Sequence, residues 1–187
     1  YTNSVQEQLD IRYNNLPEYV AGLRRAIQTP HDSFKKLGLN DADGNPIQIN
    51  DHILQIENEY YSPIRPKQIA DRGETPTEAL ERRGIAYVEF RAIDLDPYSD
   101  VGIRLSSACF LEVMALYCLL NDSPELMPNE EEELAINLER VVNEGRADNL
   151  HVLNNGTEQP LQDWMLDHLT SMQPLAAVLD AHHGGND

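Results

Sequence analysis

Apolar residues recur at helical spacing in three stretches of this chain. They lie three and four positions apart in residues 16–27, 129–144 and 161–181, which predicts amphipathic helices. Pro17 suits the first turn of the first of these helices. Pro174 predicts an interruption of the last one, because a proline inside a helix removes a backbone hydrogen bond.

Residues 53–61 alternate between apolar and polar in a way that predicts a strand. One face of this strand carries Glu57, Glu59 and Tyr61. The chain continues into residues 62–67, where two prolines restrict the residues between them to extended conformations. Such a rigid loop suits an anion, because Arg65 and Lys67 need little ordering on binding. A solvent-exposed connector fits the same residues, and on these residues alone it is the better interpretation.

Residues 85–94 predict a buried strand with two charges in its middle. Tyr87, Glu89 and Arg91 point to one face of it. An unpaired buried charge is costly, and a paired one is weak evidence for stability. Two interpretations therefore fit equally: a Glu–Arg pair on the open face of a sheet, or a ligand or metal site.

Two further helices are expected between and after these strands. Thr75 can cap a short helix that ends near Gly84, with Glu78 completing a capping box. Residues 106–120 are almost wholly apolar, which predicts a buried helix too short to span a bilayer. Strands in the first half and mostly helices in the second predict an α+β fold, with an antiparallel sheet backed by helices.

Charge and cysteine content narrow the classes of partner. The chain has 187 residues, with 14 Lys and Arg against 32 Asp and Glu, and a net charge of −18. This charge predicts no binding to nucleic acid or to anionic membranes. Cys109 and Cys118 lie on different sides of one helix, so no disulfide between them is expected and both are interpreted as buried. With no visible signal peptide, a cytoplasmic protein is expected.

Four separated blocks carry a resemblance to a known family, the proteobacterial type of glutamate–cysteine ligase. The blocks are residues 1–3 (YTN), 18–23 (EYVAGL), 54–67 (LQIENEYYSPIRPK) and 84–94 (GIAYVEFRAID). Members of that family are considerably longer, so residues 1–187 are expected to form a single partial domain that lacks an N-terminal part and a C-terminal tail. The resemblance implies a glutamine synthetase-like fold, in which a curved antiparallel sheet holds the substrates.

The same resemblance implies the reaction, which is the first step of glutathione biosynthesis. The γ-carboxylate of glutamate attacks ATP to give a γ-glutamyl phosphate, and the amine of cysteine then displaces phosphate. The expected partners are therefore small molecules, namely glutamate, cysteine and ATP. Hard divalent cations, Mg²⁺ or Mn²⁺, would neutralise the charge that a carboxylate meets at a triphosphate.

Individual roles follow from the match to the family motifs. Glu89 is expected as a magnesium ligand, and Arg91 as the catalytic contact of the transferred phosphoryl group. Arg65 and Lys67 are expected to approach the nucleotide phosphates or the glutamate.

Two tyrosines complete the sites implied by the resemblance. Tyr61 and Tyr1 are expected to line the cysteine pocket, since a phenol combines an apolar body with a polar tip. The family's other metal ligands lie in the expected N-terminal part, so the remainder of the protein is needed and this stretch alone is expected to be inactive. Two alternatives stay open: a related ligase that joins glutamate to another amine, and a non-catalytic acidic interaction module.

Overall fold

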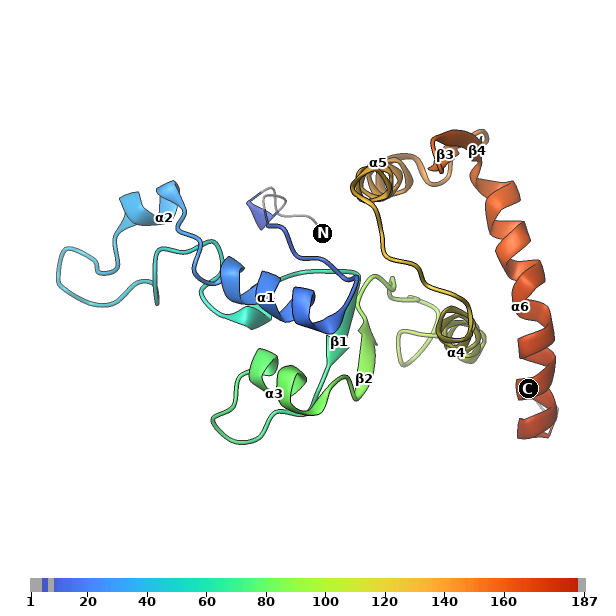
Figure 1. Cartoon of the computed structure of the whole chain (residues 1–187), viewed down its shortest axis with the longest axis horizontal. Coiled ribbons are helices and arrows are strands. Elements are labelled where there is room, and N and C mark those ends of the chain that lie inside the picture. The colour runs from blue at the N-terminus through green and yellow to red at the C-terminus, as the bar shows by residue number, and fades with distance from the viewer. Residues whose placement is uncertain (1–4, 7–8, 185–187) are drawn as a thin grey trace. The chain divides into compact units, whose positions relative to one another are not determined.

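The chain divides into two compact units, residues 1–94 and 95–187, and the computed structural model describes residues 5, 6 and 9–184 (Figure 1). The first unit contains α1 (Leu16–Ala26), α2 (Asp32–Leu37), the 3₁₀ turn η2 (Glu57–Glu59), β1 (Ile64–Lys67), α3 (Pro76–Arg83) and β2 (Tyr87–Phe90). The second contains α4 (Leu105–Leu120), α5 (Pro128–Glu144), β3 (His151–Asn154), β4 (Thr157–Pro160) and α6 (Leu161–His183). Mixed helices and antiparallel strand pairs confirm the α+β prediction. That both units belong to one partial domain stays a prediction.

Helix α1 contributes half of the buried apolar residues of the first unit, as its apolar spacing predicted. The Asn15 side chain caps it by accepting a hydrogen bond of 2.9 Å from the Glu18 N–H. One buried cluster joins α1 to α3 and consists of Tyr19, Val20, Leu23 and Leu80. A second joins the end of α1 to the following loop and consists of Ala26, Ile53 and Leu54.

Helix α3 begins with the predicted capping box. The Thr75 hydroxyl accepts from the Glu78 N–H at 3.3 Å, and the Glu78 carboxylate accepts from the Thr75 N–H at 2.8 Å. The helix ends at Gly84, which has a φ of 75°. A residue with a Cβ atom is strained in that conformation, so the sequence sets this boundary locally.

The strand predicted for residues 53–61 is wrong. Ile53 and Leu54 are both buried, although they are neighbours that a strand would place on opposite faces. Glu57 begins a single 3₁₀ turn, and the Glu59 carboxylate accepts the Gln55 N–H at 2.7 Å. The carboxylate thus satisfies a backbone donor that a neighbouring strand would otherwise have to satisfy. The expected common face of Glu57, Glu59 and Tyr61 is therefore absent.

The extended segment after this turn is confirmed, and it is a paired strand rather than a free loop. β1 pairs with β2 in an antiparallel register that sets Ile64 opposite Phe90. The prediction that residues 85–94 form a buried strand is wrong in extent and in burial. β2 covers only Tyr87–Phe90, and Tyr87 and Val88 are 48% and 47% exposed. A two-stranded pair leaves its faces open unless another layer covers them.

In the second unit the helices are where the sequence predicts them, but they bury little. No residue of α4 is buried, so the expected buried helix is wrong in burial although correct in position. Cys109 and Cys118 are free as expected, yet half-buried and exposed rather than buried. α6 continues through Pro174, so the predicted interruption is also wrong. No helix within residues 5, 6 and 9–184 is long and apolar enough to cross a membrane.

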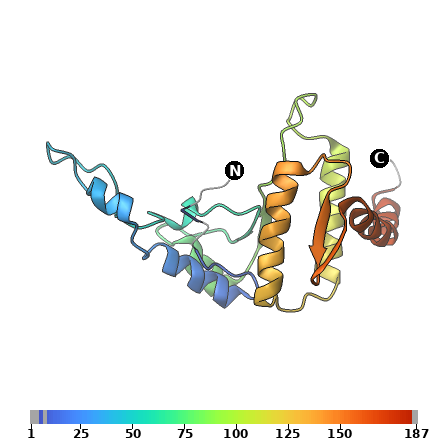
Figure 2. The same ribbon diagram turned by 90° about the horizontal axis from the view of Figure 1, so that it is seen from above.

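The hairpin of β3 and β4 was not predicted, although its signal is present in the sequence. Asn155 and Gly156 connect the strands with φ values of 51° and 75°. Asn-Gly is the preferred pair for a two-residue turn in which both φ angles are positive. The hairpin lies along α5 (Figure 2), where the Asn137 side chain exchanges hydrogen bonds of 2.8 and 2.7 Å with the Leu153 backbone.

Candidate functional site

The β1–β2 pair brings three of the predicted site residues onto one small platform. Its register sets Arg65 opposite Glu89 and Lys67 opposite Tyr87. Residues that face each other across an antiparallel pair project to the same side. Arg65, Lys67 and Glu89 therefore share a face, and the Arg91 N–H extends the pairing by donating to the Pro63 carbonyl at 2.8 Å.

Glu89 has a carboxylate oxygen without a partner. Its Oε2 atom is buried and has no hydrogen bond, while the residue as a whole is half-buried. Leaving a buried polar atom unsatisfied costs about 1–3 kcal/mol, and more when the group is charged. A desolvated carboxylate oxygen with free lone pairs fits a cation ligand, so the residue present is suited to a hard metal ion.

Among the described residues, Glu89 belongs to no larger group of possible metal ligands. Within the portion that the structure describes, no three His, Cys, Asp or Glu side chains lie close enough to hold a metal ion. A cation at Glu89 would therefore need further ligands from outside the described residues.

Arg91 and Tyr61 come from different segments and meet in space. The Arg91 guanidinium carbon lies 5.6 Å from the centroid of the Tyr61 ring, within the range of a cation–π interaction. Arg91 is otherwise exposed, so its donors are accessible to an anion. The Tyr61 N–H donates to the Gln6 side chain at 3.0 Å. Tyr1, the other tyrosine expected in the cysteine pocket, lies outside the described residues.

Arg65 and Lys67 differ sharply in their surroundings. Arg65 is only 7% exposed, and its Nη2 atom lies within hydrogen-bond distance of three backbone carbonyls. Lys67 is half-buried, and its side chain makes no hydrogen bond or ion pair to any residue that the structure describes. Of the two, Lys67 has the donors that remain open to a ligand.

Glu57, expected to support Tyr61 from the same strand face, instead holds the start of α3. Its Oε2 atom accepts from the Thr77 N–H at 2.8 Å, and its Oε1 atom accepts from the Thr77 hydroxyl at 2.5 Å. Both residues are buried, with 8% and 1% exposed. Nothing in the sequence pattern pointed to Thr77, because it is separated from Glu57 by twenty positions.

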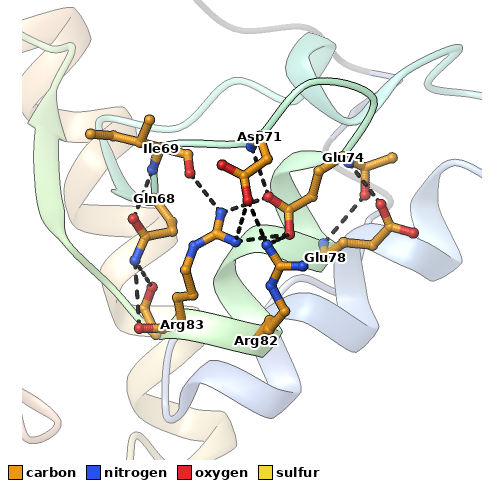
Figure 3. A network of polar contacts seen from close by, with 9 residues as sticks. Gln68, Ile69, Asp71, Glu74, Glu78, Arg82 and Arg83 are labelled. Carbon is orange, nitrogen blue, oxygen red and sulfur yellow. Dashed lines mark hydrogen bonds and ion pairs between the residues drawn. The ribbon is translucent and has the colours of Figure 1, made fainter.

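A surface network ties the ends of β1 and β2 together (Figure 3). Arg83 donates to the Glu74 carboxylate at 2.6 Å and to Asp71 at 3.2 Å, and it lowers the pKa of Glu74. The Gln68 side chain, just after β1, donates to the Gly84 carbonyl, just before β2, at 3.0 Å. The consecutive arginines at the end of α3 were the available sequence signal for this network, which was not predicted.

Comparison with known proteins decides the family. A sequence model described as glutamate-cysteine ligase matches residues 1–141 of this chain. The chain belongs to the glutamate–cysteine ligase family. A glutamate–cysteine ligase of Alcanivorax borkumensis is 47% identical over 100% of this chain and 36% of its own length. One of Pseudoalteromonas translucida is 46% identical over 98% of this chain and 35% of its own. The family resemblance inferred from the sequence motifs is thus confirmed.

A solved structure of the family agrees with the fold. The glutamate–cysteine ligase of Francisella tularensis in complex with AMP is 41% identical, with a TM-score of 0.87, over 92% of this chain and 35% of that one. The chain therefore spans about a third of the length of the ligases that it matches. The described strands form two-stranded sheets, so the larger curved sheet of a glutamine synthetase-like fold stays a prediction.

Proposed function

We propose that this chain is part of an ATP-dependent glutamate–cysteine ligase, and that its β1–β2 pair forms one wall of the active site. The observation that carries the proposal is the buried, unpartnered Oε2 atom of Glu89, two residues before the exposed Arg91. Family membership supports the ligation of glutamate to cysteine, and the AMP complex of the Francisella relative supports the use of an adenine nucleotide. A glutamine synthetase-like curved sheet would extend this pair.

In the proposed reaction Glu89 interacts with positive charge, that of the metal ion, and Arg91 with the negative charge of the transferred phosphoryl group. An oxygen of the glutamate γ-carboxylate attacks the γ-phosphorus, and the bond to the ADP oxygen breaks. Bound Mg²⁺ or Mn²⁺ would supply charge neutralisation of the phosphates, with Glu89 as one of its ligands. The Arg91 guanidinium donates to the equatorial oxygens of the transferred group, whose negative charge it stabilises.

The second half-reaction joins the amine. The cysteine nitrogen attacks the acyl carbon of γ-glutamyl phosphate, phosphate leaves, and the nitrogen loses a proton. Tyr61 and Tyr1 line the cysteine pocket in this proposal, with the Tyr61 ring held beneath Arg91. Lys67 approaches the nucleotide phosphates. The remainder of the protein supplies the other metal ligands, so residues 1–187 alone are inactive.

The test measures ADP release by the full-length ligase with ATP, magnesium and glutamate, with and without cysteine. Wild type should show cysteine-dependent release. Glu89→Gln should lose roughly 100-fold or more, because losing a metal ligand removes about 3 kcal/mol of transition-state stabilisation. Glu112→Gln, an exposed carboxylate on α4, is the matched control and should retain wild-type turnover.

A readout independent of turnover is Mn²⁺ binding, followed by electron paramagnetic resonance, which Glu89→Gln should weaken. Full turnover of the variant at ordinary magnesium would exclude Glu89 from the metal site. Release with an amine other than cysteine would assign a related ligase. No release from folded full-length protein would favour an acidic interaction module.

A further inference from the structure

Three polar residues that the proposed reaction does not use are buried together beside the candidate site. Glu57, Arg65 and Thr77, here called the buried clamp, are 8%, 7% and 1% exposed. Burying charged groups is expensive, and apolar residues of similar volume often stabilise a protein equally well or better. Their contacts therefore indicate a role in holding specific geometry.

At one end of the clamp, Arg65 hydrogen-bonds to the backbone of the turn before Tyr61. The Arg65 Nη2 atom lies 3.4, 3.2 and 2.5 Å from the carbonyl oxygens of Glu57, Asn58 and Tyr60. These carbonyls belong to η2 and the residue that ends it. The Glu57 carbonyl also accepts the Tyr60 N–H at 3.3 Å, so the guanidinium adds to the hydrogen bond that closes the turn. All three contacts converge on one terminal nitrogen, Nη2, of a rigid planar group, and the flexible stem of a lysine does not fix a nitrogen at that place as firmly.

The Glu57 end anchors the same turn to α3. Both carboxylate oxygens are occupied by Thr77, one by its N–H and one by its hydroxyl. Thr77 lies in the first turn of α3, where the helix dipole favours a negative charge. The turn is thus fixed at one side by a helix and at the other by a strand residue.

Tyr61 follows this turn directly, and Glu89 faces Arg65 across the strand pair. On the far side of Tyr61, buried Ser62 donates to the Ile64 carbonyl at 2.7 Å. We propose that Arg65 and Glu57 are positioning residues that set the backbone of Tyr61, and through it the amine-substrate pocket, without touching any substrate. This inference rests on the proposed function, and it replaces the expectation that Arg65 approaches phosphate, because the Arg65 side chain points inward to carbonyls.

The kinetic test compares Arg65→Lys with Lys67→Met in the full-length ligase. Arg65→Lys should raise the KM for cysteine roughly tenfold or more and change the KM for ATP by less than about twofold, because a misplaced tyrosine affects the amine substrate. Lys67→Met should show the opposite split. A rise in the KM for ATP with Arg65→Lys, equal to or larger than that for cysteine, would overturn the proposal.

Hydrogen–deuterium exchange tests the clamp without relying on activity. Arg65→Lys should speed exchange in residues 57–62 and leave α5 unchanged, and unaltered exchange there would contradict the proposal even if the ligase assay failed. Should the variant not fold, Thr77→Val is the milder one. It removes one hydroxyl bond to Glu57 while keeping the shape and the N–H, and it should raise the KM for cysteine about threefold. An unchanged KM with Thr77→Val would equally count against the clamp.

Discussion

The two units differ in how many of their apolar side chains are buried, with far more in residues 1–94 than in residues 95–187. Within the described residues, only Val152 and Met172 of the second unit belong to the buried apolar set, and every other member lies in the first unit. Yet α4, in the second unit, is the most apolar segment of the sequence, with Leu119 and Leu120 76% and 71% exposed. Apolar content therefore does not measure burial.

The difference lies in what each helix packs against. In the first unit α1 and α3 each have one apolar face, and those faces meet each other in the cluster around Leu23 and Leu80. Side-chain caps at Asn15 and Thr75 fix where these two helices begin. In α4 the apolar side chains point in all directions, and within these residues, which span about a third of the length of the relatives, none of them is fully buried. A helix is buried by complementary surfaces, whereas hydrophobicity only makes burial favourable.

A matched pair of leucine truncations should give the largest difference in stability between the two units. Leu54→Ala should destabilise the first unit by about 2–5 kcal/mol, because Leu54 is 0% exposed and the change leaves a cavity. Leu119→Ala on α4 should stay within about 0.5 kcal/mol of wild type. Amide hydrogen exchange in α1 and α3 measures the stability of the first unit.

The chain's single tryptophan, Trp164, lies in α6 and reports the second unit by fluorescence during urea unfolding. A Leu54→Ala change that moved both signals equally would show that the units unfold together. A large effect of Leu119→Ala would contradict the difference between the units, because it would mean that the exposed face of α4 is packed in solution.

Raising the pH above 10 should lower the stability of the first unit, because that unit contains two tyrosines whose pKa values are raised by burial. Burial raises the pKa of Tyr19 to about 12 from 10.0, and burial likewise raises the pKa of Tyr60. Because the folded pKa lies above the unfolded one, the stabilisation is complete below pH 10 and is lost as the pH rises towards 12. By pH 11 the ionisation of Tyr19 alone should lower the free energy of unfolding of the first unit by about 1.4 kcal/mol. Tyr19→Phe should flatten this slope in exchange-detected stability, and a slope unchanged in the variant would refute the assignment.

The hydroxyl that caps α3 should contribute less to stability than the buried side chains. Thr75→Ala removes the hydroxyl that accepts the Glu78 N–H, and it should cost the first unit about 1 kcal/mol. Thr75→Ser keeps the hydroxyl and serves as the control. Thermal unfolding followed by circular dichroism, together with exchange in α3, measures both. Equal losses in the two variants would show that the hydroxyl is not what matters.

Short-range patterns were sufficient for much of the first unit and for the family. Apolar spacing, Pro17 and the Thr75 capping box located α1 and α3 to within a residue or two. The prolines around Arg65 fixed an extended backbone, which became β1. Glu89 and Arg91 stood out from the strand pattern of residues 85–94, their roles came from the family resemblance, and the structure brings Arg91 against Tyr61. The Asn155–Gly156 turn was equally local, and attention to it would have found the second hairpin.

Features whose causes lie within a few residues follow from the sequence alone: helix positions, caps, the extended segment, and the motifs that mark the family. Contacts between distant segments make Glu57 reach Thr77 instead of lining a strand, turn Arg65 inward, and leave no residue of α4 fully buried within this stretch. These outcomes depend on which distant surfaces meet. A pattern along the chain records the preference of a side chain for burial or for a partner, but packing determines whether that preference is met.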